Sequence, residues 1–164
     1  GLVEWSITTK LPWGILLLFG GGLSMANAIM SSGLGKWIGG LIPDISAVLL
    51  ILLIVVLIVF LTELTSNQAT TATFVPIMII LATVEGNLLP DGTSNLSLVA
   101  QLAIPVALAA SCAFMLPVAT PPNAIVYGSE KFTIAQMMKA GLYFNILGIL
   151  VVTAFSTFVL PLIF

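Results

Sequence analysis

The tetrapeptide Thr65-Ser66-Asn67-Gln68 separates two apolar segments of the chain, Ala47 to Leu64 and Ala69 to Thr83. A backbone N–H or C=O group that is left unpaired in hydrocarbon costs several kcal/mol, so a membrane protein tolerates irregular backbone only where it is buried in protein or lines a site. Ser46 is predicted to cap the first of the two helices. The break therefore predicts a helical hairpin with a functional tip.

A second break, Ala119-Thr120-Pro121-Pro122-Asn123, interrupts the apolar sequence farther along the chain. Its two prolines have no N–H to donate, and a proline disfavours helical geometry in the preceding residue, so Val118 to Thr120 is predicted to be unwound. A helix from Ser97 to Pro117 would end here, and a short helix from Asn123 to Gly128 would follow. Two breaks of matched type indicate a site built from discontinuous helices.

The composition is that of an integral membrane protein. Hydrophobic residues make up 60% of the 164 residues, charged residues only 6%, and the mean hydropathy is +1.25. Soluble domains carry about 25% charged residues. The sequence has no His and a single Cys112, which excludes an intrachain disulfide framework and His-based catalytic centres. We expect a membrane protein that is not an enzyme and binds no nucleic acid.

Further membrane elements are predicted outside the breaks. A membrane helix needs about 20 apolar residues, and Pro12 to Met30 and Ala140 to Phe164 provide such runs. The first contains Gly20-Gly21-Gly22, which would let a neighbouring helix approach closely. Leu34 to Ile42 is too short to cross and is predicted to lie along the membrane surface. Thr133 to Lys139 is predicted to be a connector.

Two interpretations of the hairpin remain open. Either both arms cross the bilayer and turn at its far surface, or the hairpin is re-entrant and its tip stops midway. Re-entry is favoured by the polarity gradient, because hydroxyls, an amide and the Glu63 carboxylate gather at the tip while the base is apolar.

Glu63 is a candidate in its own right, because a carboxylate at membrane depth is by default a functional hypothesis, here a proton carrier. The alternative is a structural role, in which Glu63 pairs with a neighbour of the hairpin or faces water near the site. We favour the structural role, since no basic residue lies nearby in the sequence to form a relay.

Charge placement predicts the orientation. If the chain crosses in this order, one side carries three basic residues, Lys10, Lys131 and Lys139. The acidic loop with Glu85 and Asp91 falls on the other side, so the positive-inside rule puts the C-terminus outside. Lys36 departs from this pattern.

The chemistry of the breaks suits an anion and a cation together. Helix C-termini carry about −0.5 charge and N-termini about +0.5, so each break offers both kinds of site. Neutral oxygens for an alkali cation come from Thr62, Thr65, Ser66 and Asn67. Donors to a carboxylate or sulfate come from Asn67, Thr120 and Asn123. Neither break holds Arg or Lys, so a bound anion would depend on a co-bound cation. Taken singly, such hydroxyls usually satisfy their own backbone and a Pro-Pro is usually a kink.

Two stretches carry a family resemblance. They are Thr62-Glu63-Leu64-Thr65-Ser66-Asn67-Gln68-Ala69-Thr70-Thr71 and Ala113-Phe114-Met115-Leu116-Pro117-Val118-Ala119-Thr120-Pro121-Pro122-Asn123-Ala124-Ile125-Val126. Both closely resemble the divalent anion/sodium symporter family, which includes sodium-coupled dicarboxylate and citrate carriers. The resemblance implies the C-terminal half of such a transporter. That half is one of two inverted repeats, and the transport domain moves like an elevator against a dimeric scaffold.

The resemblance implies an all-α polytopic membrane fold with a re-entrant hairpin and a discontinuous, unwound helix. Three parts follow: a membrane helix and an interfacial arm helix at 1–44, transport-domain elements at 45–129, and a connector with the last membrane helix at 130–164. Within the second part, the hairpin occupies 45–84 and the unwound helix 97–129.

The resemblance also implies the site residues. A sodium ion would be held by Thr62, Thr65, Asn67 and Ala119, largely through carbonyls. The substrate anion would meet Ser66, Asn67, Gln68, Thr120, Pro121 and Asn123. Gln68 stands where the bacterial motif usually has Thr, which leaves dicarboxylate specificity open.

The predicted function is half of a sodium-coupled symporter for dicarboxylates such as succinate or for tricarboxylates, in a bacterial inner membrane. Because the chain begins at Gly1 and has few spans, we expect it to need the N-terminal half and to form a homodimer when complete. The alternatives are a proton-coupled carrier that uses Glu63, a sulfate or other anion carrier of a related family, and a non-transporting membrane assembly subunit.

Overall fold

The structure is a computed structural model that describes residues 13–34, 46–83 and 95–164, together with Trp5, Thr9, Leu11 and Trp37. All regular structure in these residues is helical, as predicted. The elements are α2 (Trp13–Ser31), α4 (Ala47–Thr62), α5 (Asn67–Thr83), α6 (Leu96–Ala110), α7 (Pro121–Tyr127), α8 (Ile134–Ala154), a π-helix (Phe155–Val159) and α9 (Leu160–Ile163).

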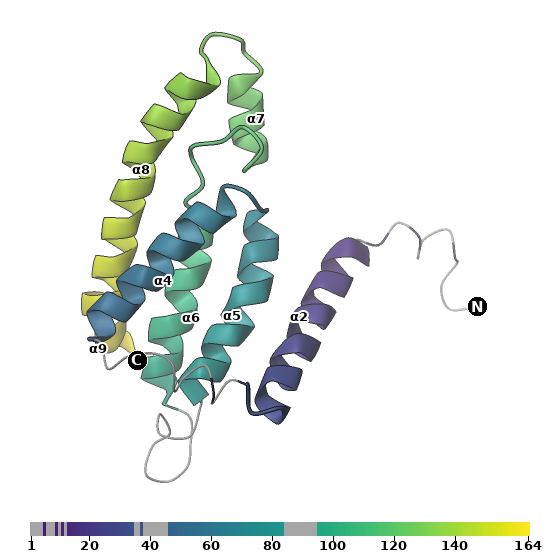
Figure 1. The fold of residues 1–164 in the computed structure, drawn as a ribbon, viewed down its shortest axis with the longest axis vertical. Helices are drawn as coiled ribbons and strands as arrows, with labels where there is room; N and C mark the ends of the chain where they lie inside the picture. The colour runs from purple at the N-terminus through teal and green to yellow at the C-terminus, as the bar shows by residue number, and fades with distance from the viewer. Residues whose placement is uncertain are drawn as a thin grey trace.

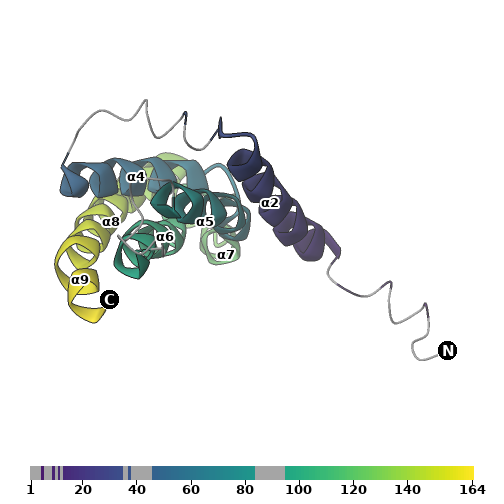
Figure 2. The same cartoon turned by 90° about the horizontal axis from the view of Figure 1, so that it is seen from below.

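The two breaks lie next to each other, at the same end of helices α4, α5 and α6 (Figure 1). The antiparallel α4–α5 hairpin packs against α6, so its tip stands beside the place where α6 ends and the chain continues to α7. α8 then runs back along α4 and α6. Figure 2 shows these helices grouped together, with α2 outside the group against α5.

The core lies where α4, α5, α6 and α8 meet. Val55, Ile58 and Val106 are fully excluded from solvent there. The outer faces are apolar as well, since Leu57 is 56% and Leu162 is 84% exposed. A surface of this kind is suited to lipid or to further protein.

The hairpin forms as predicted, with one shifted boundary. The Ser46 hydroxyl accepts the Leu49 N–H at 3.4 Å and caps α4. α4 ends at Thr62 rather than at Leu64, and α5 begins at Asn67, so the tip is the short turn between them.

One glycine of the predicted packing triplet makes a close helix contact. A Cβ atom on Gly22 would lie 2.8 Å from the carbonyl oxygen of Ala72 in α5, whereas Gly20 and Gly21 have nothing within 4 Å. The close approach is confirmed at Gly22, where α2 meets α5.

The last helix is longer than predicted. It begins at Ile134 rather than Ala140, because Thr133 and Gln136 form a capping box in which each side chain bonds the other residue's backbone N–H. With the π-helix and α9 it forms a 30-residue segment, Ile134–Ile163, which is the helix in the described residues that is long and apolar enough to cross a membrane. The predicted connector at Thr133 to Lys139 is therefore wrong.

Some predictions lie outside the described residues. The arm helix at Leu34 to Ile42 falls almost entirely outside them, as does the acidic loop with Glu85 and Asp91. Lys10 and Lys36, which entered the orientation argument, also lie outside.

Candidate functional site

The hairpin tip is held mainly by its own side chains. The Ser66 hydroxyl accepts the Ala69 N–H at 3.1 Å, as an N-cap does for α5. The hydroxyls of Thr65 and Thr70 lie 2.6 Å apart, and that of Thr65 also donates to the Leu61 carbonyl at 3.1 Å. These contacts join residues at most five positions apart, so the tip is a local structure.

Thr62 links the tip to the end of α6. Its hydroxyl is fully buried and lies 2.8 Å from Oδ1 of Asn67 and 2.9 Å from the carbonyl oxygen of Ala110. A hydroxyl has one proton, so three oxygens converge with a single proton among them. Ala110 was not among the predicted site residues.

The second break is longer than predicted. We expected α6 to continue to Pro117 and only Val118 to Thr120 to be unwound, but α6 ends at Ala110 and residues 111–120 are not helical. The prolines explain only the far end of this segment. Its near end depends on a residue from the hairpin.

That residue is Glu63, at the end of α4. Its side chain is only 4% exposed, and its carboxylate accepts the backbone N–H groups of Phe114, Met115 and Leu116 at 2.8, 2.9 and 3.0 Å. The carboxylate thus takes the place of the helical carbonyl acceptors for three consecutive residues. These contacts are structural, but they join Glu63 to the second break and not to a hairpin neighbour or to water, which were the two surroundings that the sequence suggested.

Asn123 and Thr120 stabilise the far side of the break. The Thr120 hydroxyl accepts the Asn123 N–H at 3.3 Å and caps α7. The Asn123 amide donates both its protons within the chain, to the carbonyls of Ala113 at 2.9 Å and Leu116 at 3.0 Å. In this geometry Asn123 therefore shapes the site, and a donation from its amide to substrate remains a prediction.

Helix α8 packs against the second break through two residues that were not predicted from the sequence. Asn145 is fully buried and donates from Nδ2 to Oε1 of Glu63 at 2.8 Å. One turn earlier, a Cβ atom on Gly141 would lie 2.6 Å from Cα of Met115 and would overlap the carbonyl of Phe114. A lone Asn in an apolar membrane helix is a signal that could have found this place.

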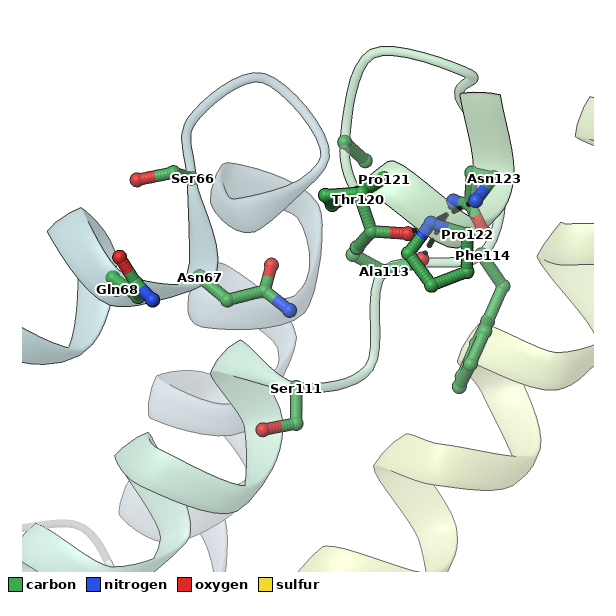
Figure 3. A pocket seen from close by; sticks show the side chains of 11 residues that line it. Ser66, Asn67, Gln68, Ser111, Ala113, Phe114, Thr120, Pro121, Pro122 and Asn123 are labelled. Atoms are coloured by element: carbon green, nitrogen blue, oxygen red, sulfur yellow. Dashed lines mark hydrogen bonds between the residues drawn. The ribbon is translucent and has the colours of Figure 1, made fainter. Parts of the chain in front are cut away.

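A cavity of about 540 Å³ lies between the two breaks (Figure 3). This volume is within the usual range of small-molecule sites, about 300–1,000 Å³. In Figure 3 the Asn67 side chain extends from the tip toward the second break, and Thr120 and Pro121 stand opposite. The lining residues are Ser66, Asn67, Gln68, Ser111, Ala113, Phe114, Ala119, Thr120, Pro121, Pro122 and Asn123.

The cavity brings together all the residues predicted to meet substrate, and none of its lining residues, all within the described part of the chain, is charged. Of the predicted sodium residues, Asn67 and Ala119 line it. Thr62 lies buried against Asn67, and Thr65 turns toward Thr70. Ser111 and Phe114 line the cavity although they were not predicted.

Comparison with known proteins identifies the family. Residues 1–164 match the family described as the sodium:sulfate symporter transmembrane region. The chain belongs to the sodium:sulfate symporter family. This confirms the resemblance found in the two polar stretches, and it places the chain in a transporter family rather than an enzyme family.

Three similar proteins match almost the whole of this chain. The sodium-dependent dicarboxylate transporters SdcS of Staphylococcus aureus strains USA300, NCTC 8325 / PS 47 and bovine RF122 are each 41% identical over 165 residues. The match covers 99% of this chain and 30% of each relative. The chain thus spans less than a third of these relatives, a smaller share than the half that we expected.

Proposed function

We propose that this chain is part of a sodium-coupled symporter that carries dicarboxylates or tricarboxylates. The observation that supports this most is the cavity in which the hairpin tip and the second break face each other without a charged side chain among the lining residues. The family description names sulfate and the relatives are named dicarboxylate transporters, so both support a sodium-coupled carrier of a divalent anion, and the relatives favour a carboxylate.

The anion would bind where neutral donors face the cavity. Helix α5 begins at Asn67, beside the cavity, and the N-terminus of a helix stabilises a bound negative charge. The Asn67 amide and Thr120 would contact a substrate carboxylate, with Ser66, Gln68, Pro121 and Asn123 around it. No basic side chain of this chain lines the cavity, so we propose that a co-bound cation supplies further positive charge.

Sodium would supply that charge. The oxygens of Thr62, Asn67 and Ala110 converge with one proton among them, so this neighbourhood offers neutral oxygen ligands to a cation. We propose a sodium ion in this neighbourhood, held by Thr62, Thr65, Asn67 and Ala119. Sodium here is a transported co-substrate.

The hairpin lengths favour a re-entrant arrangement. α4 has 16 residues and α5 has 17, which gives each a length of about 24–26 Å at 1.5 Å per residue. The hydrocarbon core is about 30 Å thick. We propose that the tip stops within the membrane, so that the hairpin and the unwound helix form one inverted repeat of an elevator-type transporter.

The remainder of the relatives' length would supply the second repeat and the rest of the site. In the complete protein we propose a multi-pass homodimer in a bacterial inner membrane, with the C-terminus outside. The sequence pattern that supports this orientation is the lysine distribution.

Uptake by proteoliposomes that contain the complete transporter tests the proposal. We expect labelled succinate to enter when an inward sodium gradient is imposed and to stop entering when choline replaces sodium. Uptake that is indifferent to sodium would exclude the coupling. Competition by unlabelled citrate and sulfate then identifies the preferred anion.

The two alternative functions make different predictions. A proton-coupled carrier requires pH-driven uptake that Glu63→Gln abolishes, whereas the buried, four-fold hydrogen-bonded Glu63 is suited to a fixed structural role. A non-transporting assembly subunit requires that Asn67→Ala and Thr120→Ala leave function intact. Loss of uptake in these two variants, with normal amounts of protein, would exclude the subunit alternative.

A further inference from the structure

We propose that Glu63 and Asn145 act as a positioning pair that holds the unwound segment in the shape required for binding. This inference rests on the proposed function, because it assigns the residues that shape the same site. Neither residue lines the cavity, so both would act through the backbone of residues 113–116.

Glu63 and the preceding residue, Thr62, together replace a helical hydrogen bond at both of its ends. If α6 continued, the Phe114 N–H would donate to the Ala110 carbonyl one turn earlier. Instead, the Ala110 carbonyl oxygen lies 2.9 Å from the Thr62 hydroxyl, and the Phe114 N–H donates to Glu63 at 2.8 Å. Two adjacent residues of the hairpin, Thr62 and Glu63, therefore end α6 at Ala110.

The peptide groups beyond Ala110 are held from two opposite sides. The N–H groups of Phe114, Met115 and Leu116 point to the Glu63 carboxylate, an arrangement in which successive backbone N–H groups hold an anion. The carbonyls of Ala113 and Leu116 accept the Asn123 amide. The cavity wall at Ala119 to Pro121 follows directly, so its place depends on this anchored segment.

Asn145 fixes the carboxylate in turn. It is fully buried, and its Nδ2 donates to Oε1 of Glu63 at 2.8 Å, while its Oδ1 has no partner in the part of the chain that the structure describes. Turning the amide over would bring Oδ1 against the carboxylate. Gly141 on the same helix admits the backbone of Phe114 and Met115, so α8 holds both the carboxylate and the segment.

Transport kinetics of the complete protein test the pair. Glu63→Gln keeps the shape but replaces one of the two carboxylate oxygens by an NH₂ donor; with the amide oxygen at the Oε1 position, the Leu116 N–H would face that NH₂ group instead of an acceptor. We expect the KM for succinate and the half-saturating sodium concentration to rise about tenfold or more, with a smaller change in the maximal rate per folded protein. Glu130→Gln, at an exposed carboxylate, is the matched control and should change neither.

A second measurement does not depend on substrate. Cys112 is half-buried in the unwound segment, two residues before Phe114, and its sulfur faces Gly148 of α8. We therefore expect Glu63→Gln and Asn145→Leu to accelerate the labelling of Cys112 by maleimide. Peptide mass spectrometry on the monodisperse fraction of the purified complete transporter measures the labelling rate. Thr153→Val, which removes another polar group from α8, should label like the wild type.

A swapped pair separates positioning from simple contact between α4 and α8. The double variant Glu63→Gln with Asn145→Asp keeps a carboxylate against an amide but moves the charge away from the three N–H groups. We expect the KM for succinate and the rate of Cys112 labelling in the double variant to remain as far above the wild-type values as in Glu63→Gln alone. Recovery to wild-type values would overturn the proposal.

The outcomes are distinguishable from a failure of the proposed function. If the wild type takes up neither succinate nor citrate, the proposed function is wrong, and Cys112 labelling still tests the pair. If Glu63→Gln and Asn145→Leu match the wild type in both labelling and KM, the positioning pair is wrong while the symporter stands. If one variant yields no folded protein, the other decides by the same two measurements.

Discussion

The two breaks are built in different ways, although both are short polar interruptions in the sequence. The hairpin tip satisfies its backbone with neighbours, as in the Ser66 cap on Ala69. The second break depends on partners far away in the sequence, since Glu63 reaches across more than 50 residues to Phe114, Met115 and Leu116. The comparison teaches that a short break can be self-contained, whereas a ten-residue unwound segment needs support from other helices.

The largest effect that this comparison predicts is at Gly141, behind the second break. A methyl group there would overlap the backbone of Phe114 and Met115, which cannot move without displacing the Glu63 anchor. We expect Gly141→Ala to destabilise the protein by about 3 kcal/mol, the upper end of typical overpacking costs. Thermal unfolding of the purified complete transporter in detergent measures this.

Gly21→Ala is the control for that prediction, because a Cβ atom on Gly21 has nothing within 4 Å in the described residues. If Gly141→Ala melts at the same temperature as Gly21→Ala, the close packing of α8 against the break is wrong.

Asn123 should show the next largest effect. Asn123→Ala leaves the carbonyls of Ala113 and Leu116 without their shared donor. An unsatisfied buried acceptor costs about 1–3 kcal/mol. Ala113 is buried and Leu116 is half-buried, so we expect a loss of about 2 kcal/mol together with weaker succinate binding. Unfolding and binding are both measured on the purified protein, and unchanged stability would mean that the break does not need this side chain.

The smallest effect should come from the tip itself. Ser66→Ala removes the N-cap of α5, and loss of a cap costs about 1 kcal/mol. The hairpin can then bond water or rearrange locally, so we expect a smaller fall in melting temperature than for Asn123→Ala. The reverse order of these two variants would contradict the contrast between a local tip and a long-range break.

The same contrast explains which features could be predicted from the sequence. The place of the tip was predictable because most of its contacts join residues between Leu61 and Thr70, which are close together in the sequence. Pro121 indicated the far end of the second break directly. The near end at Ala110 was not, because nothing in its neighbours stops a helix there. It is set by Thr62 and Glu63 from another element.

The last helix also has one feature that a local signal predicts and one that depends on a tertiary contact. Its start at Ile134 follows from the capping box of Thr133 and Gln136, a local signal that is present in the sequence and outweighs the polar character of the segment. The role of Asn145, by contrast, depends on a tertiary contact with Glu63. A buried polar residue in a membrane helix indicates a site but does not identify its partner.

The central claim is that the two breaks form one site in which sodium and an organic anion bind together. The most direct measurement is equilibrium binding of labelled succinate to the purified complete transporter, in sodium and in potassium, for the wild type, Asn67→Ala and Thr120→Ala. We predict binding that requires sodium and weakens about tenfold or more in each variant, because each removes a polar contact with a charged ligand. Binding that is equal in both salts, or unchanged in both variants, would contradict the account.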